Sequence, residues 1–152
     1  AEQGNADAES HLGYLYLHGQ GTRQDYTQAF NWLQKAAQQG NEDAENLLGS
    51  LYRIGRGTQQ DYTQAFNWYQ KAAEQGNADA ESHLGYLYLH GQGTQQDYTL
   101  AFYWFQKAAE QGSANACLDL SFIYSHGQGV EKNQLQAQYW IDRAKQLQSN
   151  GG

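Results

Sequence analysis

Two pairs of histidines recur at a spacing of seven residues, and histidine is the side chain best suited to metal binding and to proton transfer near neutral pH. The pairs are His11 with His18 and His83 with His90. Seven residues on one helix place both rings on one side but about 10 Å apart along the axis. A metal ion needs its ligands within about 2.1 Å, so one helix cannot supply both. We predict no metal site, and we interpret His18, His90 and His126, which each precede a Gly-x-Gly turn, as helix-capping residues.

The single cysteine, Cys117, is the one thiol that could act as a nucleophile. One cysteine excludes a disulfide within the chain and every zinc motif that needs several cysteines. No base is adjacent in the sequence, and the equivalent positions of the other repeats hold Glu9, Glu45 and Glu81. We therefore interpret this position as a surface or groove-edge site rather than a nucleophile pocket.

Two further patterns resemble enzyme motifs only superficially. Gly19-Gln20-Gly21 has the spacing of a phosphate-binding loop, but it follows a helix instead of a strand and its glycines recur four times. Asp7 and Glu9 are two residues apart, so they point to different sides of a helix and cannot act on one substrate. We predict no catalytic residues, no cofactor and no enzymatic activity.

A 36-residue period organises all of these residues, and it is the main feature of the sequence. The segments 1–36 and 73–108 differ at only four positions, which indicates duplication. These are Arg23/Gln95, Gln28/Leu100, Asn31/Tyr103 and Leu33/Phe105. The residues that keep the period in every repeat include Gly4, Gly40, Gly76 and Gly112, then Leu12, Leu48, Leu84 and Leu120, and then Trp32, Trp68, Trp104 and Trp140.

Each repeat is predicted to form two helices. The first spans about 6–17, with Asn5 as its N-cap and Gly19 as its stop signal. The second begins at Asp25, which forms a capping box with Gln28, and ends at Gly40. The box recurs as Asp61/Gln64 and Asn133/Gln136 and is lost in the third repeat, where Leu100 stands; the first N-cap recurs as Asn41, Asn77 and Ser113. Connections this short favour antiparallel neighbours.

Three glycines, Gly13, Gly49 and Gly85, fall in the middle of the first helices. Glycine costs about 1 kcal/mol relative to alanine in a helix, so a repeated glycine needs a reason. We expect close helix–helix approach, with a large Trp or Tyr of the partner helix over the bare backbone. A functional hinge is the alternative.

The repeat string resembles the Sel1-like repeat family, a relative of the tetratricopeptide repeats. It reads Ala-x-x-x-Leu-Gly-x-x-Tyr-x-x-Gly-x-Gly, then Asp-Tyr-x-x-Ala-x-x-Trp-x-x-Lys-Ala-Ala-x-Gln-Gly. The resemblance covers nearly the whole chain and implies an all-α fold, a right-handed α/α superhelix (solenoid) of four 36-residue helix-turn-helix repeats. It also implies a bacterial adaptor, scaffold or inhibitor. We expect one repeat domain over 1–152, with repeats 1–36, 37–72, 73–108 and 109–144 and a tail at 145–152. The cysteine pairs of the family's disulfide-linked members are lacking.

The two ends of the array differ from its middle. Ser121, Gln134, Gln138 and Arg143 replace Gly, Tyr, Phe and Lys of the pattern, and we interpret 109–148 as a polar C-terminal cap. Residues 1–4 repeat 73–76, which is the tail of a second helix. This favours a piece of a longer array; a simple leader turn is the alternative. End-to-end self-association through the N-terminal repeat is a further possibility.

Charge limits the classes of partner. The net charge of −7 disfavours nucleic acids and anionic lipids, and it favours a basic or neutral protein or peptide. No run of 18 apolar residues predicts a membrane span. The compartment stays open between the cytoplasm and an exported, periplasmic location.

One face of the first helices is predicted to bind the partner, because the resemblance places it on a concave groove and because it carries aromatic side chains among charges. An ordinary solvated face is the alternative. The proposed roles are a scaffold or adaptor, or else a dedicated inhibitor or immunity protein. Repeat two differs most on this face, and we expect Arg53 to be an anchor there. The face comprises Asp7, Ser10, Tyr14, Leu17 and His18; Asp43, Asn46, Ser50, Arg53 and Ile54; Asp79, Ser82, Tyr86, Leu89 and His90; and Phe122 with Asn115, Leu118, Ser125 and His126.

Overall fold

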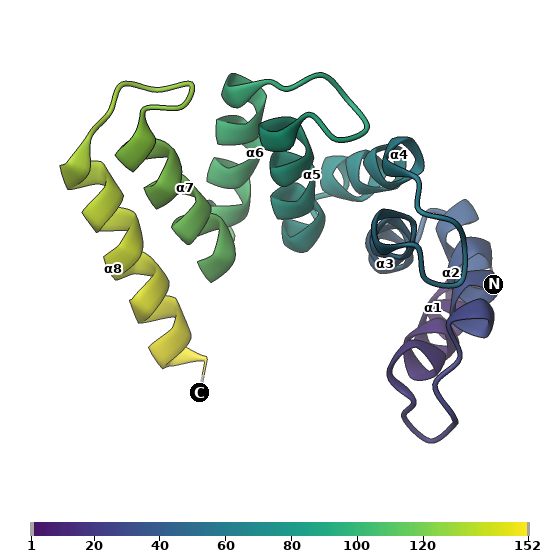
Figure 1. Cartoon of the computed structure of the whole chain (residues 1–152). Coiled ribbons are helices and arrows are strands. Elements are labelled where there is room, and N and C mark those ends of the chain that lie inside the picture. The colour runs from purple at the N-terminus through teal and green to yellow at the C-terminus, as the bar shows by residue number, and fades with distance from the viewer. Residues whose placement is uncertain (1, 152) are drawn as a thin grey trace. The chain divides into compact units, whose positions relative to one another are not determined.

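The structure, a computed structural model, describes residues 2–151, with side chains from residue 4 onward. All regular structure in this range is helical, which confirms the all-α repeat fold (Figure 1). The helices are α1 (Glu2–His18), α2 (Tyr26–Gln38), α3 (Glu42–Ile54), α4 (Tyr62–Glu74), α5 (Ala78–His90), α6 (Tyr98–Glu110), α7 (Ala114–His126) and α8 (Gln134–Asn150).

The chain forms two compact units, each of two repeats. Unit 1 comprises Ala1–Asn77 and unit 2 comprises Ala78–Gly152. Within a unit each helix packs against the next one in the chain, and Figure 1 shows α7 and α8 lying side by side and antiparallel. The core of unit 1 joins α2 to α3 through Leu33, Ala36, Ala37, Ala44 and Leu48. In unit 2, Phe105, Ala108 and Ala109 of α6 share a core with Ala116 and Leu120 of α7.

The second helices begin as predicted, but with half of the expected capping box. The Asp25 carboxylate accepts the Gln28 backbone N–H at 3.0 Å. The backbone N–H of Asp25, which a capping box would pair with the Gln28 side chain, instead donates to the Tyr16 carbonyl at 2.9 Å. Repeat three therefore keeps its N-cap, with Asp97 accepting from the Leu100 N–H at 3.0 Å. The leucine removes the capping-box pattern, as predicted, but the cap itself does not use the side chain at that position.

The first helices end at glycines in the left-handed conformation, as predicted. Gly55 has φ +80° and Gly127 has φ +66°. In repeat one, a glutamine side chain also caps the end of the first helix: the Gln24 amide donates to the Leu17 carbonyl at 2.8 Å. His126 Nδ1 lies 2.9 Å from the Phe122 carbonyl, so this histidine can serve the capping role.

The mid-helix glycines mark close contacts between helices, as expected. The partner is a tyrosine at Gly49, as predicted, but it is Leu33 at Gly13 and Phe105 at Gly85. A Cβ on Gly49 would lie 2.8 Å from the Tyr69 ring, and one on Gly85 would lie 2.9 Å from the Phe105 ring. In repeats one to three the residue after the tryptophan, not the tryptophan itself, fills the interior. Trp68 is half-buried on the surface, with the Lys71 ammonium 4.6 Å from its ring centroid.

Repeat one departs from the prediction at its start. Helix α1 begins at Glu2, so Asn5 lies inside the helix and is not its N-cap. Leu12 is 38 % exposed, whereas its equivalent Leu48 is fully buried against α2. No element of the described chain packs on this face of α1. Asn41 and Ser113 do cap their helices, accepting from Ala44 and Ala116 backbone N–H groups.

Three of the four polar replacements in the fourth repeat lie on the surface, as expected, on a helix that also exposes Leu135 and Tyr139. Gln134, Gln138 and Arg143 are exposed on α8. Ser121 is only 6 % exposed, so it replaces the glycine at a buried position and is not part of a polar outer face.

Candidate functional site

The predicted face of the first helices divides into a centre and an edge, and we call the whole the first-helix surface. At 100° per residue, Tyr14 and His18 lie within about 20° of the direction of Asp7, whereas Ser10 and Leu17 lie about 60–80° away, toward neighbouring helices. Exposure follows this rule at most positions. Two positions depart from it: Ser50 shares the direction of Tyr14 but is half-buried, and Leu118 shares that of Ser10 but is 43 % exposed. The exposed members are Asp7, Tyr14, His18, Asp43, Ile54, Asp79, Tyr86, His90, Asn115, Leu118, Phe122 and His126; Leu17, Ser50, Arg53, Ser82 and Ser125 are half-buried.

Three residues of the predicted face are not available to a partner. Ser10, Asn46 and Leu89 are 7–8 % exposed. A step of three residues along a helix turns a side chain by about 60° from the starting direction, here toward the adjacent helix. These three positions are therefore corrected to buried positions.

Aromatic–histidine pairs form the centre of the surface in three repeats. The Tyr14 and His18 ring centroids are 4.3 Å apart, those of Tyr86 and His90 are 4.2 Å apart, and Phe122 stacks on His126 at 4.0 Å. Each pair is spaced by one helical turn, which brings the two rings together. Tyr86 is 42 % and Phe122 47 % exposed, so large aromatic surfaces face the solvent.

Repeat two lacks this pair, because Ser50 and Ile54 stand in place of the aromatic residue and the histidine. Ser50 and its neighbour Arg53 instead bind a buried hydroxyl. Tyr69 is fully buried, and its hydroxyl lies 2.8 Å from Ser50 Oγ and 3.3 Å from Arg53 Nε, which donates to it. Burial raises the pKa of Tyr69, and these hydrogen bonds act in the opposite direction. Repeats one and three hold Leu33 and Phe105 at the same position, with no hydroxyl to satisfy. The departures at Ser50 and Arg53 thus have a structural cause, and Arg53 is not a free surface charge.

A ladder of side-chain amides and carboxylates joins successive repeats, and sequence reasoning missed it. The Asn41 amide donates to Asp7 at 2.8 Å, and the Asn77 amide donates to Asp43 at 3.1 Å. A second row links Gln75 to Glu45 at 2.7 Å. Constant spacings of 34 and 30 residues between complementary side chains are the signal that could have revealed it. The two aspartates therefore connect repeats, and each has a second carboxylate oxygen.

The second row explains the environment of Cys117, which was wrongly placed at the surface. Its equivalents Glu45 and Glu81 are 3 % and 0 % exposed, and Cys117 is itself fully buried. Burial raises the pKa of both glutamates, and the hydrogen bonds from Gln75 and Gln111 oppose that shift. Burial also raises the pKa of the Cys117 thiol, which disfavours the nucleophilic thiolate.

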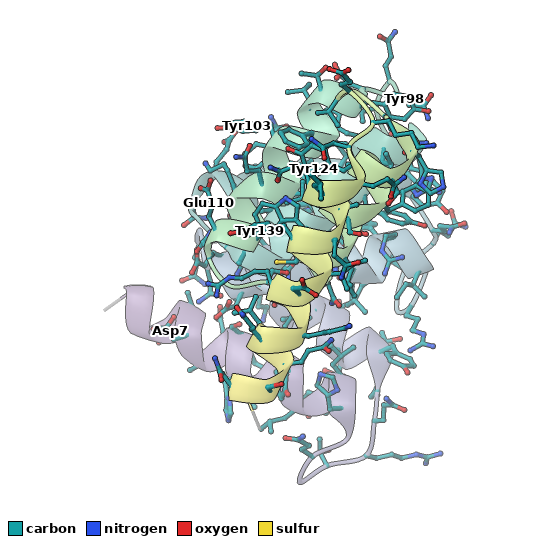
Figure 2. All side chains as sticks on the ribbon, turned by 90° about the vertical axis from the view of Figure 1, so that its left-hand side faces the viewer. Asp7, Tyr98, Tyr103, Glu110, Tyr124 and Tyr139 are labelled. Carbon is teal, nitrogen blue, oxygen red and sulfur yellow. The ribbon has the colours of Figure 1, made fainter. Side chains whose placement is uncertain are left out.

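A polar hollow of about 890 Å³ lies in unit 1 where α2 meets α3. Three carboxylates contribute to it, and no basic side chain does, so its field favours a cation. Figure 2 marks one of them, Asp7, on α1. The lining residues are Ala6, Asp7, Gln38, Gln39, Gly40, Asn41, Glu42, Asp43 and Gln75.

Groups of metal-ligating side chains and carboxylates with a raised pKa are the remaining candidates for a metal or catalytic site. The described part of the chain contains no group of three metal-ligating side chains. Asp119, which the sequence did not single out, has a pKa raised by burial to about 6, but it lies in α7 without a nucleophile beside it in the sequence. None of the described helices is long and apolar enough to cross a membrane.

Comparison with known proteins identifies the repeats. The Sel1 repeat family model matches four times, at residues 6–41, 42–77, 78–113 and 114–149. A protective antigen of uropathogenic Escherichia coli with an SLR fold is 40 % identical, with a TM-score of 0.89 over 96 % of this chain and 31 % of that one. A Sel1 repeat protein from Oxalobacter formigenes is 36 % identical, with a TM-score of 0.89 over 94 % of this chain and 58 % of that one.

A more distant structure, cysteine rich protein B of Helicobacter pylori, is 26 % identical, with a TM-score of 0.64 over 76 % of this chain and 86 % of that one. No curated protein matches the sequence at a significant level. The chain spans about a third and just over half of the first two relatives. With matches that tile residues 6–149 and a shared solenoid fold, the chain belongs to the Sel1 repeat family.

Proposed function

We propose that this chain is a protein-interaction module, a scaffold or adaptor, which binds a partner protein through the first-helix surface. Sel1 repeat proteins generally mediate protein–protein interactions and are typically not enzymes. The observation that carries the proposal is the repeated pair of exposed rings, Tyr14 with His18, Tyr86 with His90 and Phe122 with His126. Exposed aromatic side chains that recur at one position are typical anchors of recognition surfaces.

The partner is expected to be basic where it meets unit 1. Asp7, Glu42 and Asp43 line one hollow, and they attract lysine and arginine side chains. In unit 2 the surface is more apolar, since Tyr86, Leu118 and Phe122 are each more than 40 % exposed. The surface of unit 1 thus favours basic side chains of a partner, and that of unit 2 favours apolar ones.

Site-directed photo-crosslinking in an extract of the source organism tests this proposal. A photoreactive phenylalanine replaces Tyr86 in one variant and Gln106, an exposed residue of α6 in the same unit, in the control. We expect a protein adduct from position 86 and none of the same mass from position 106. Equal labelling at both positions, or at neither, contradicts the assignment of the surface.

The same adduct separates the two proposed roles. One abundant partner bound tightly in a one-to-one complex favours the alternative, an inhibitor or immunity protein. Several partners of modest affinity favour a scaffold or adaptor.

A further inference from the structure

A second exposed apolar surface lies on the second helices of unit 2. Tyr103 of α6 is 49 % exposed, and Leu135 and Tyr139 of α8 are 85 % and 56 % exposed; Leu100 of α6 adds to them at 38 %. We call these four residues the outer patch. The second helices of unit 1 carry amides or a threonine at the equivalent positions, namely Thr27, Gln28 and Asn31 in α2 and Thr63, Gln64 and Asn67 in α4.

Repeats one and three are nearly identical, but repeat three has gained apolar side chains in the outer patch. Two of the four differences between 1–36 and 73–108 exchange an amide for an apolar side chain, Gln28/Leu100 and Asn31/Tyr103. Both new side chains are exposed and lie three residues apart on one face of α6. Neither belongs to the core of unit 2, so the exchange does not serve packing within the unit.

Each tyrosine of the outer patch packs against a half-buried tryptophan that follows it in the sequence. Tyr103 and Trp104 meet edge to face at 5.1 Å, and Tyr139 and Trp140 do the same at 5.0 Å. The Lys107 ammonium lies 5.5 Å from the Tyr103 ring centroid. Figure 2 shows Tyr103 and Tyr139 on the same side of unit 2, on α6 and α8. Rigid aromatic pairs of this kind provide a large contact area at a small entropic cost.

The charges around the patch point to its occupant. Lys107 and Glu110 lie on α6, and Asp142 and Arg143 lie within about one helical turn of Tyr139 on α8, which also carries Lys145. Charges of both signs therefore accompany the patch on each helix, whereas carboxylates are the only charged groups of the hollow in unit 1. On such a surface a two-fold rotation can bring charges of opposite sign together, as an isologous interface requires.

We propose that the outer patch is the interface of a homodimer in which unit 2 of one chain packs on unit 2 of a second copy. The first-helix surface is separate from it, so the dimer carries two copies of the partner-binding surface and gains avidity toward a multivalent partner. This interface differs from the end-to-end contact through the N-terminal repeat that the sequence suggested. The proposal does not depend on the proposed partner binding.

Sedimentation equilibrium over a wide range of concentrations tests the dimer with a matched variant. The double substitution Leu100→Gln and Tyr103→Asn restores the residues of repeat one, which form helix α2 in the same fold. We expect reversible dimerisation of the unmodified chain and a dissociation constant at least about tenfold higher in the variant. Tyr139→Asn, on α8, should weaken the dimer independently.

Two control variants locate the contact. Tyr86→Asn alters the first-helix surface of the same unit, and Leu12→Gln alters the exposed face of α1; both should leave the dimer unchanged. A monomer at every concentration overturns the proposal. So does a dimer that survives Leu100→Gln with Tyr103→Asn, or one that is lost with Leu12→Gln or Tyr86→Asn.

Discussion

At the scale of single residues, neighbours in the sequence have very different energetic roles. Tyr69 is fully buried and fills the space over Gly49, whereas Trp68 beside it is half-buried under a lysine. The larger and more regular residue of the repeat pattern is thus the less buried one. Conspicuous periodicity identifies an element's register, but it does not identify which residue lies at the centre of the core.

Tyr69→Ala should therefore destabilise the protein more than Trp68→Ala. Removal of a buried aromatic side chain typically costs about 3–5 kcal/mol. The partly exposed tryptophan should cost about half as much or less, because the transfer free energy scales with the area removed from water. Urea unfolding followed by circular dichroism measures both; equal midpoints would show that Trp68 is a core residue.

Asp119 should make stability depend on pH. Burial raises the pKa of Asp119 from 3.8 to about 6 in the folded protein. Between these two pH values the folded protein therefore keeps a proton on Asp119 that the unfolded chain releases. Its contribution is most favourable below pH 3.8 and is lost as the pH rises through about 6. Asp119→Asn should stabilise the protein at pH 7 by on the order of 1 kcal/mol, with no gain near pH 3.5.

Thermal unfolding of Asp119→Asn at several pH values checks this sign. Glu131→Gln, which removes an exposed carboxylate of the same unit, is the control. A stabilisation by Asp119→Asn that is the same at acid and neutral pH would contradict a titration effect.

At the scale of elements, each second helix depends on one side-chain cap and one backbone hydrogen bond at its start. Asp61 and Asp97 both accept from the backbone N–H three residues on. The cap's own N–H donates to a tyrosine carbonyl of the preceding helix, so the turn between the two helices is held from both sides. The side chain at the third position takes no part, which explains why leucine is tolerated there.

Asp61→Ala should cost about 1 kcal/mol of stability, as the loss of an N-cap usually does. Gln64→Ala should cost no more than a few tenths of that, because alanine is a good helix former and no capping-box partner is lost. Chemical denaturation of the two variants decides the point. A loss in Gln64→Ala as large as in Asp61→Ala would restore the full capping box.

At the scale of the whole molecule, the position of a repeat in the array determines how much a repeated residue contributes to stability. Leu12 and Leu48 occupy the same place in successive repeats, but only Leu48 is covered by a helix. Leu48→Ala should cost about 2–5 kcal/mol and Leu12→Ala less than about 1 kcal/mol. Urea midpoints test the order, and similar losses would show that something covers α1 in solution.

Sequence alone determined many of the features that depend on local chemistry or on repetition. The 36-residue period, the helical alternation, the aspartate caps and the left-handed glycines all follow from residue types at fixed spacings. The exposed centre of the first-helix surface followed as well, because Tyr14 and His18 share the direction of Asp7. The exposure of the residues at the edge of this surface could not be predicted, since burial there depends on neighbouring helices.

Only the tertiary structure decided which secondary structure two segments of identical sequence adopt. Residues 2–18 and 74–90 have the same sequence, yet the first is one continuous helix and the second contains the end of α4, a turn and the whole of α5. Ala72 and Ala73 are buried in the core of unit 1 near the end of α4, which ends at Glu74, and Gly76 takes φ +93° where the chain turns. Around Gly4 the chain makes no such turn, and the local preference for helix prevails. The burial of Cys117 in a position that otherwise holds glutamate has the same origin: contacts made by distant residues outweigh local preference.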